Sequence, residues 1–399
     1  MIAQRVQAIA PSETLKISGR AKELQREGKS VISLSQGEPD FKTPKHICEA
    51  AIQAINDGHH GYTMNTGNPE LREAISNKLK RENGLTYAPD QIILSNGAKQ
   101  SIGFSILATI NPGDEVIIPA PYWVSYPEMV KLAEGIPVII SSEFDNDYKI
   151  TAEQLRNAIT SKTKMLILCS PSNPTGSCYS MEELKSLAEV LREYPDILIL
   201  SDEIYEYIVF DDTHAGIAQA APDLIDRVLL INGFSKGFAM TGWRLGYLAG
   251  PAAVVKAVSK IQSQETSGPC TISQKAGEAA YLSPLDSVTV MVKAFRERRD
   301  YLVEALNSIE GVKCFKPGGA FYAFPDISAY LNSVTPGGDL IRNSTDLCLF
   351  LLEERGLAAV PGDAFGEPAG IRLSYAASMD HLKEAIRRLK EGLEALKKQ

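Results

Sequence analysis

The sequence predicts an α/β protein with a mostly parallel sheet. Apolar runs with the length and composition of strands alternate with helical segments until about residue 285. The runs are continuous rather than alternating in polarity, which is typical of strands covered on both faces. They lie at 91–94, 115–118, 164–169, 196–200 and 228–231. In such sheets ligands bind beyond the C-terminal ends of the strands, so the residues that follow each run are the first candidates for a site.

Composition limits the class of protein. The chain has 399 residues, of which 44% are hydrophobic and 23% charged, enough for two or three domains and too apolar for disorder. The formal net charge of −8 argues against nucleic acid as a partner. No run of roughly 18 apolar residues is present and the N-terminus lacks a secretory signal, so we expect no membrane partner and a cytoplasmic location.

The cysteines and histidines do not predict a metal site. The six cysteines are scattered without a CxxC pair, which in a chain without a secretory signal indicates reduced thiols. The five histidines show no HxxxH or comparable spacing, so we expect no bound metal.

The first elements surround a turn with a glycine that lets the backbone approach a neighbour. We expect a helix at 21–27 and a strand at 31–34, followed by a turn at 36–41 in which Gly37 precedes Glu-Pro. Gly37 would suit close approach to a ligand, although a plain turn is the simpler explanation. A helix at 44–58 follows, then Tyr62 in a turn, where packing is the common role of a tyrosine, and another helix from 67.

Small residues follow the strand at 91–94 and lead into a helix. Gly97, Ala98 and Lys99 leave backbone N–H groups free at the positive end of that helix, where phosphate binds favourably. No GxGxxG or Walker sequence is present, so neither a dinucleotide nor ATP is indicated. A glycine turn is weak by itself, but with Arg244 it would form a two-sided phosphate site.

Two further loops after strands carry side chains suited to an aromatic ligand. Trp123 follows the strand at 115–118, and its indole either stacks on a cofactor or belongs to the core; its position does not decide between them. Asn173 lies between Pro171 and Pro174, whose fixed backbone aims its amide. An ordinary proline-rich turn would also explain that segment.

A carboxylate ends the next apolar run. Asp202 lies at the C-terminal end of the strand that begins near 196, and a carboxylate so placed must be paired or protonated. A pyridinium N–H would be a fitting partner, and Tyr205, three residues later, can face the same crevice. The alternative is that Asp202 only caps the end of its strand.

The segment 232–247 is the part of the chain on which the other motifs depend. Lys236 lies just past the strand at 228–231 among glycine, serine and aromatic residues, and poor solvation there disfavours its ammonium form. Such an amine can condense with a carbonyl to give a Schiff base. Arg244, eight residues later, offers a planar fork for phosphate or carboxylate. A surface loop with two unrelated cations is disfavoured by the large apolar residues around them.

A second region begins at Pro284 and Asp286, where a long helix starts. A turn and strand follow at 318–324, and a strand at 370–375 contains Arg372. An arginine within an apolar strand needs an anion, either a structural ion-pair partner or a ligand. The last helix, at 378–398, is amphipathic and ends in lysines that suit its dipole.

The segment 232–247 is similar to the lysine segment of the aspartate aminotransferase family, which belongs to the fold-type I pyridoxal-phosphate (PLP) enzymes. Ser235-Lys236, five residues, then Gly-x-Arg-x-Gly-Tyr follow the pattern of the branch that this chain resembles, and 173–176 match its Asn-Pro-Thr-Gly signature. The match runs from about Pro11 to the C-terminal helix. It implies a three-layer α/β/α large domain that binds PLP, at 41–285, and a smaller α+β domain. The smaller domain would be built from the arm at 1–40 and from 286–399, and the protein would be a homodimer with active sites at the interface.

The resemblance also implies roles around the cofactor. Lys236 would carry the Schiff base and move the proton, Asp202 would keep the ring nitrogen protonated, and Tyr205 with Asn173 would stabilise the phenolate. Trp123 would stack on the ring. The phosphate would be held by Gly97, Ala98, Lys99, Ser235, Arg244 and Tyr62 of the partner subunit. The α-carboxylate of the substrate would be bound by Gly37, Asn173 and Arg372, and Trp123 would also contact the substrate.

The expected substrate depends on two positions at which this chain differs from well-known members of the family and on two positions at which it matches one branch of it. The enzymes best known from animals and enteric bacteria have a serine where this chain has Gly233, and the arginine that they lend across the dimer to the distal carboxylate has no match here. In the bacterial and plant branch a lysine of the phosphate loop does that work, and Lys99 matches it. Thr14 matches a threonine found with prephenate transamination. Both could also be solvated surface residues. We expect aspartate or glutamate as donor, oxaloacetate or 2-oxoglutarate as acceptor, and prephenate as a further candidate.

Other functions stay open from the sequence. An aminotransferase for alanine or aromatic amino acids, or a PLP lyase or decarboxylase, would use the same cofactor apparatus. A non-catalytic PLP-binding regulator would carry an added DNA-binding segment, for which we expect no room before Pro11. A plain α/β binding protein without a cofactor would require Lys236, Arg244, Asp202, Asn173 and Arg372 all to be accidental.

Overall fold

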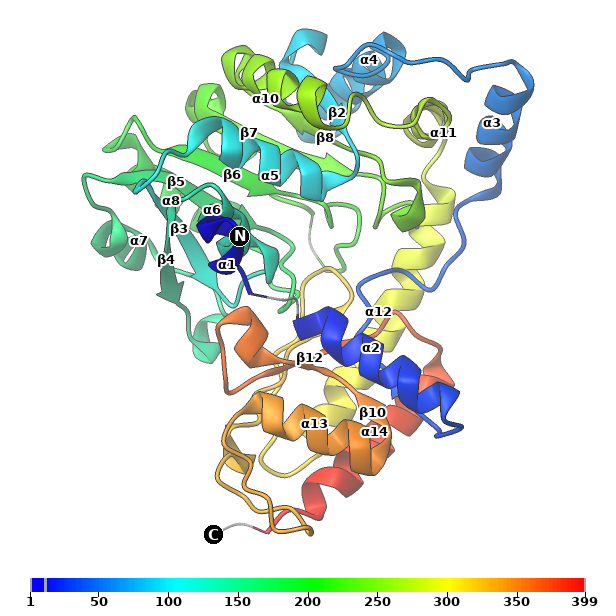
Figure 1. The fold of residues 1–399 in the computed structure, drawn as a ribbon, viewed down its shortest axis with the longest axis vertical. Helices are drawn as coiled ribbons and strands as arrows, with labels where there is room; N and C mark the ends of the chain where they lie inside the picture. Colours follow the sequence, from blue (N-terminus) through cyan, green and yellow to red (C-terminus); the bar gives the residue numbers. More distant parts are fainter. Residues whose placement is uncertain (1, 11–12, 212, 398–399) are drawn as a thin grey trace.

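The computed structural model describes residues 2–10, 13–211 and 213–397, without the side chains of 13–15. A seven-stranded sheet forms the centre of the larger part of the molecule (Figure 1). The strands lie in the order β2-β8-β7-β6-β5-β3-β4. Their bounds are β2 Ile92–Ser95, β3 Glu115–Ala120, β4 Ile136–Ser141, β5 Thr163–Cys169, β6 Leu198–Asp202, β7 Val228–Gly233 and β8 Gly246–Ala249.

The sheet is mostly parallel, as expected. Only β8 runs antiparallel to its neighbours, β2 and β7, and the other strands share one direction. The register pairs Cys169 of β5 with Asp202 of β6, and Asp202 with Ile231 of β7. The C-terminal ends of three neighbouring strands therefore meet at one edge of the sheet, where ligands bind in parallel sheets.

Helices cover both faces of this sheet. Leu166, Leu168 and Ile199 belong to one buried cluster, whereas Ile167 and Leu200 belong to another, so neighbouring residues of a strand face opposite layers. The first cluster contains residues of α3 Lys45–Asn56, α4 Pro69–Lys78, α7 Ala152–Ala158, α8 Met181–Arg192, α9 Ile217–Ala220 and α11 Thr271–Leu282. The second contains residues of α5 Ala98–Thr109, α6 Ser125–Leu132 and α10 Ala252–Glu265. The expected three-layer α/β/α arrangement is confirmed.

A smaller part lies below the large sheet in Figure 1 and combines α2 and β1, from near the N-terminus, with the C-terminal part of the chain. Its sheets are β11-β12-β9 and β1-β10, and the second pairs Ile32 with Leu357, so the N-terminal segment joins the C-terminal one. The strands are β1 Ile32–Ser33, β9 Tyr322–Ala323, β10 Leu357–Ala358, β11 Val360–Pro361 and β12 Ile371–Ser374. The helices are α2 Glu13–Arg26, α12 Asp286–Asn307, α13 Ser344–Arg355 and α14 Met379–Glu394, while α1 Gln4–Gln7 lies against α6. The domain boundaries near 40 and 285 stay a prediction.

The structure differs from the expected elements mainly at their ends. Helix α2 begins at Glu13 rather than near 21, and the strand expected at 31–34 is only two residues long. Helix α4 continues after Lys78 as a five-residue π-helix, Leu79–Asn83, which ends at Gly84 with a left-handed φ of 68°. Strands β4 and β8 were not among the expected strands, so the antiparallel direction of β8 was not expected either.

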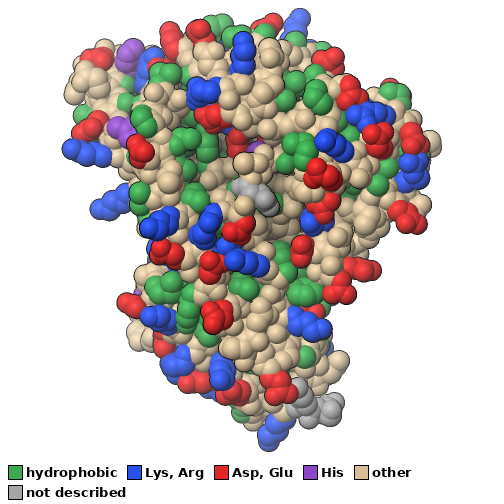
Figure 2. Space-filling view, turned by 180° about the vertical axis from the view of Figure 1, so that it is seen from behind, with side chains coloured by type: hydrophobic (Ala, Val, Ile, Leu, Met, Phe, Trp, Pro, Cys, Tyr) green, Lys and Arg blue, Asp and Glu red, His purple; other side chains and the backbone are tan. Residues whose placement is uncertain are grey.

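None of the helices in the described ranges is long and apolar enough to cross a membrane. On the face seen in Figure 2, basic and acidic side chains are interspersed. That face therefore offers no continuous basic surface of the kind that nucleic acids require. The His, Cys, Asp and Glu side chains of the described residues form no group of three or more that could hold a metal ion.

Candidate active site

Lys236 lies in the loop after β7, where its side chain is half-buried. Phe234, Phe238 and Met240 around it are fully buried. Its Nζ donates a hydrogen bond of 2.6 Å to the carbonyl of Gly37. Burial lowers the pKa of Lys236 to about 8, because the desolvated ammonium form is disfavoured. The amine therefore loses its proton more readily than that of a surface lysine.

Asp202 ends β6, the strand beside β7, and only 4% of it is exposed. Its Oδ2 accepts a 2.6 Å hydrogen bond from the Tyr126 hydroxyl, and Oδ1 accepts one of 3.2 Å from the backbone N–H of Ile204. Burial raises the pKa of Asp202 to about 6, so the carboxylate is still ionised at neutral pH. A buried anion of this kind requires a positively charged or hydrogen-donating partner.

Asn173 and Tyr205 reach the same end of the sheet from the loops after β5 and β6. Asn173 is buried, and its Oδ1 accepts a hydrogen bond of 2.9 Å from Arg372. The hydroxyl of Tyr205 lies 2.8 Å from that of Tyr322, and the Nζ of Lys236 lies 5.9 Å from the centre of the Tyr205 ring. Burial raises the pKa of Tyr205 well above its usual range, so its hydroxyl stays protonated and can donate.

Arg244 lies against the start of α5. Gly97, the residue before the helix, has a left-handed φ of 84°, and a Cβ there would lie 2.5 Å from Nη2 of Arg244. Arg244 donates a 3.1 Å hydrogen bond to the carbonyl of Asn96. A Cβ on Gly246 would lie 2.4 Å from the backbone nitrogen of Ala98. Two glycines thus bring a guanidinium to the positive end of a helix, a combination suited to a phosphate.

Lys99, in the first turn of α5, extends over Trp123. Its Nζ lies 4.8 Å from the centre of the indole ring, and burial together with the nearby charge of Arg244 lowers the pKa of Lys99. Trp123 in turn meets Tyr126 edge to face, with ring centres 5.3 Å apart. Ser235, just before Lys236, is buried at the end of β7. The proposed ring-stacking residue and the proposed distal-carboxylate lysine are therefore neighbours.

Arg372 enters from β12 of the smaller part and is 3% exposed. Its Nη2 donates a 2.7 Å hydrogen bond to the carbonyl of Ser35, and its guanidinium lies 4.6 Å from the centre of the Tyr322 ring. Its Nε is buried without a hydrogen-bond partner. Burial lowers the pKa of Arg372, and no described carboxylate balances its charge. This arginine is arranged to receive an anion.

Four cations in this region form no ion pair with a carboxylate of the described residues: Lys99, Lys236, Arg244 and Arg372. The arginines are close enough to Lys236 to depress its pKa further. Buried cations elsewhere behave differently, since Lys78 pairs with Glu206 and Arg299 with Asp211. The excess positive charge is therefore specific to this crevice and calls for a ligand with several negative groups.

Two of the predicted residues are not part of this cluster. Tyr62 is 99% exposed on the loop between α3 and α4, so it takes no part in the site of its own chain. The side chain of Thr14 lies outside the described residues. Gly37 is in the cluster, but here its carbonyl accepts a hydrogen bond from Lys236.

Two tyrosines of the site were not predicted from the sequence. Tyr126 binds Asp202, and Tyr322 lies between Tyr205 and Arg372. The local signal for Tyr126 is that it follows Trp123, which lies just before α6, by three residues. That signal becomes visible only once the direction of the helix is known.

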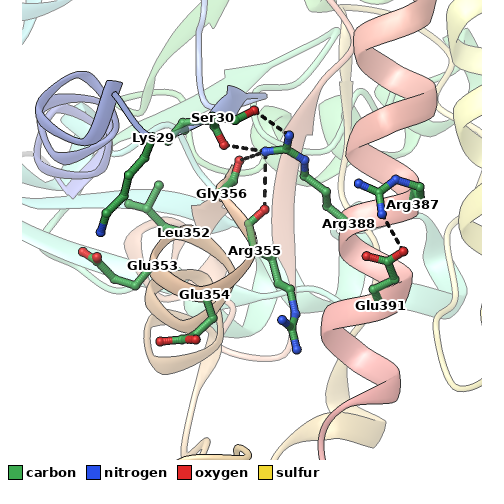
Figure 3. Close-up of a pocket in the computed structure, with 11 residues that line it drawn as sticks. Lys29, Ser30, Leu352, Glu353, Glu354, Arg355, Gly356, Arg387, Arg388 and Glu391 are labelled. Atoms are coloured by element: carbon green, nitrogen blue, oxygen red, sulfur yellow. Dashed lines mark hydrogen bonds and ion pairs between the residues drawn. The ribbon is translucent and has the colours of Figure 1, made fainter. Parts of the chain in front are cut away.

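A polar cavity of about 360 Å³ lies elsewhere, in the smaller part of the molecule (Figure 3). Figure 3 shows the guanidinium of Arg388 donating to the carbonyl groups of Ser30, Arg355 and Gly356, at 2.7, 3.4 and 2.9 Å. Arg387 pairs with Glu391 along α14. These groups tie chain segments together and do not converge on one point as the groups around Lys236 do.

The fold and the site together define an enzyme class that binds a multiply anionic ligand beside a desolvated amine at the edge of a parallel sheet. The chain belongs to the class I and II aminotransferases, a family whose pattern matches residues 29–389. It is therefore an aminotransferase.

Named relatives span nearly the whole chain. The bifunctional aspartate aminotransferase and glutamate/aspartate-prephenate aminotransferase of Petunia hybrida is 52% identical over 99% of this chain and 83% of that protein. The aspartate/prephenate aminotransferase of Nitrosomonas europaea is 50% identical over 97% of this chain and 98% of that protein. Among solved structures, the aspartate aminotransferase of Rhizobium meliloti matches with a TM-score of 0.96, 46% identity and 99% coverage of both chains. That of Thermus thermophilus with maleate matches with a TM-score of 0.91 and 39% identity, over 98% of this chain and 99% of that one.

Proposed function

We propose that this aminotransferase uses PLP to move an amino group from aspartate or glutamate to oxaloacetate or 2-oxoglutarate, and that prephenate is a further acceptor. The observation that carries the proposal is the group of four cations that form no ion pair with any carboxylate in the described part of the chain, beside the buried carboxylate of Asp202. PLP and a dicarboxylic amino acid together bring a phosphate and two carboxylates, which would balance these charges. The amine of Lys236 would bind the aldehyde carbon of the cofactor.

Each part of PLP would be held by a different group of residues around the crevice. The N-terminal turn of α5, with Gly97, Ala98 and Lys99, and the side chains of Ser235 and Arg244 would hold the phosphate. Asp202 would bind the ring N–H, since its buried carboxylate lacks a cation. Asn173 and Tyr205 would donate to the phenolic oxygen, and Trp123 would cover the ring. When bound, PLP supplies an electron sink that makes the Cα proton of an amino acid acidic.

Lys236 and Arg372 would then carry out the protein's share of the reaction. Arg372 would hold the α-carboxylate in a bidentate pair, with its Nε–H, which lacks a hydrogen-bond partner, as one of the donors. This contact would turn the Cα–H bond of the substrate toward Lys236. With a pKa of about 8, Lys236 can take a proton from Cα and return it to a neighbouring carbon at neutral pH.

Lys99 would bind the distal carboxylate of the substrate. It projects over Trp123 without a carboxylate partner, and a relative of known structure was solved with maleate, a dicarboxylate. Changing Lys99→Met should lower kcat/KM for aspartate by about tenfold or more, because a charge-assisted hydrogen bond is lost. Turnover of alanine, which has no distal carboxylate, should change little and serves as the internal control.

Steady-state assays on the purified protein test the proposed substrates. Aspartate, glutamate, alanine and phenylalanine would be offered as donors, with 2-oxoglutarate, oxaloacetate and prephenate as acceptors. The proposal expects the highest kcat/KM with dicarboxylic pairs and measurable turnover of prephenate. Turnover of alanine or phenylalanine with none of the dicarboxylic acids would reject it.

We further propose a homodimer in which Tyr62 of the partner subunit completes the phosphate site. Tyr62 is fully exposed, and so is much of the apolar side chain of Met64, two residues later. Helices α3 and α11, which contact each other, also expose large apolar side chains, namely Ile52, Ile55 and Leu282. A cluster of exposed large apolar residues is typical of an interface. The partner would thus contribute both apolar contact and a hydroxyl donor.

A further inference from the structure

The loop that carries Asp202 and Tyr205 also carries two acidic residues that the proposed chemistry does not use. Glu203 is 2% exposed and Glu206 is 9% exposed. Neither contributes to the crevice around Lys236, since each is hydrogen-bonded to residues on the other side of the loop. Buried carboxylates are rare unless they are paired, so their partners indicate what they do.

Glu206 receives hydrogen bonds from three elements. Both of its oxygens lie 2.5 Å from Nζ of Lys78, at the end of α4, and Lys78 is fully buried. Asn83 of the π-helix donates at 2.6 Å, and Asn232 of β7 donates at 2.6 Å. Burial by itself would raise the pKa of Glu206, but Lys78 and the other donors outweigh it and lower the pKa, so the group is an ionised carboxylate.

The residues around Glu206 contact the loop that carries Lys236 at two points. Asn232 lies four residues before Lys236, and its Oδ1 accepts a 2.7 Å hydrogen bond from the backbone N–H of Gly233. On the other side of Lys236, a Cβ on Gly237 would lie 2.8 Å from the ring of Tyr207. Nζ of Lys78 lies 5.1 Å from the centre of that same ring. Lys78 and Glu206 therefore join the segment 205–207 to the segment 232–237.

Glu203 is held separately. Ser201 donates to its Oε1 at 2.8 Å, and His214 Nε2 lies 2.8 Å from its Oε2. The two acidic residues thus add side-chain contacts to a stretch of turns whose backbone is joined to β7 through the bond from Glu203 N–H to the carbonyl of Ile231. A buried ion pair adds little net stability compared with apolar residues of the same size, but a fully satisfied one fixes geometry.

We propose that Lys78 and Glu206 are positioning residues that hold Tyr205 and Lys236 at a fixed separation from the buried side of the site. This inference rests on the proposed role of Lys236 and Tyr205 with PLP. Without the pair, the two loops would still fold against each other, but the amine and the phenol would sample several relative positions. A displacement of about 1 Å is enough to slow a reaction that depends on proton transfer at one carbon.

Two variants separate positioning from stability. Glu206→Gln keeps the shape of the side chain and, through its one amide oxygen, the hydrogen bonds from Lys78 and Asn83. It loses the acceptor for Asn232 and leaves Lys78 with only the more distant carboxylate of Glu82, at 3.8 Å. It should unfold at lower temperature yet keep a kcat within about threefold of the parent. The double variant Lys78→Met/Glu206→Met contains neither charge of this pair and should recover much of the thermal stability. Its kcat for aspartate should fall on the order of tenfold or more, with KM little changed.

Hydrogen exchange of the PLP-free protein gives a readout that does not depend on turnover. In the double variant the peptides covering 203–208 and 233–240 should exchange faster than in the parent, while Glu206→Gln should leave them close to it. Glu183→Gln is the matched control, because Glu183 is an acidic residue of α8 that pairs with Lys149 outside the two loops. It should change neither the hydrogen exchange of these peptides nor kcat.

The proposal is overturned if the double variant, once stable, has the exchange and kcat of the parent, or if kcat simply follows stability across the series. Failure of the proposed function would look different. In that case the parent would neither bind PLP nor transaminate, whereas the exchange data would still report whether the pair fixes the two loops.

Discussion

At the scale of residues, the site depends on groups that burial has moved away from their ordinary protonation. Lys236 is made a weaker cation and Asp202 a weaker acid, both because desolvation disfavours charge. Each buried charge destabilises the ligand-free fold, and each is stabilised when a ligand supplies a group of opposite charge. The arrangement therefore favours ligand binding and lowers the stability of the ligand-free protein.

The clearest residue-scale prediction concerns Asp202→Asn. The folded pKa of Asp202, about 6, lies above the ordinary value of 3.8 for an aspartate, so the ionised carboxylate destabilises the PLP-free fold. This loss of folding stability is absent below pH 3.8, grows as the pH rises from 3.8 to 6, and is complete above pH 6. The variant should thus be more stable than the parent at pH 7, on the order of 1–3 kcal/mol, but not at pH 3.5.

Denaturant unfolding of the PLP-free proteins at several pH values measures this difference. The same variant should bind PLP more weakly and lose most of its turnover, because a neutral amide cannot stabilise the protonated ring. Equal stability of parent and variant at pH 7 would mean that Asp202 is not a strained anion.

At the same scale, the principal site residues could be predicted because they fall in short contiguous motifs. Lys236 and Arg244 lie within one segment, and Asn173 lies between two prolines. Tyr322 and Tyr126 escaped prediction because their roles depend on which way a strand or helix faces. The pair of Lys78 and Glu206 joins residues 128 positions apart, so nothing local could indicate it.

At the scale of elements, the site depends on how closely backbone segments can approach. The start of α5 and Arg244 are in contact because Gly97 has no side chain and adopts a left-handed φ. Sequence patterns predicted five of the seven strands of the large sheet in their order along the chain, since apolar runs alternate with helices, but they missed β4. They did not predict the reversed β8 or the π-helix after α4, because strand direction and helix register depend on tertiary packing.

Gly97→Ala tests this close approach. The added methyl group would meet the guanidinium of Arg244 and force an alanine into a left-handed conformation, so stability should fall by roughly 1–3 kcal/mol. PLP should bind more weakly, because the methyl group displaces Arg244. Thermal unfolding and PLP titration measure the two effects.

Gly28→Ala is the matched control for that change. Gly28 has nearly the same φ, 85°, but a Cβ there would meet nothing within 4 Å. It should share the conformational cost and leave PLP affinity unchanged. Equal loss of PLP affinity in both variants would mean that contact with Arg244 is unimportant.

At the scale of the whole molecule, the site draws on both parts of one chain and, as we propose, on a second chain. Lys236 and Asp202 come from the large sheet, whereas Arg372 comes from β12 of the smaller part, which also contains the N-terminal β1. The sequence predicted this assembly only through resemblance to a family, because residues 37, 236 and 372 are too far apart along the chain for a local pattern.

Mixed dimers test the contribution of Tyr62. One subunit would carry Tyr62→Ala and the other Lys236→Ala, with different affinity tags so that only mixed dimers are purified. If Tyr62 acts across the interface, one of the two sites has both native residues, and activity should be about half that of the parent. If Tyr62 acts within its own chain, no native site exists and activity should stay at or below that of the Tyr62→Ala homodimer.

The central claim is that Lys236 and Asp202 act on one PLP molecule that cycles between its aldehyde and amine forms. The visible absorption spectrum of the PLP-loaded protein, recorded before and after aspartate is added without an acceptor, tests it most directly. We predict that the visible band of lysine-bound PLP is replaced by the shorter-wavelength band of the amine form, that 2-oxoglutarate restores it, and that Lys236→Ala abolishes the cycle. A spectrum that aspartate leaves unchanged, or the same cycle in Lys236→Ala at the parent's rate, would contradict the account.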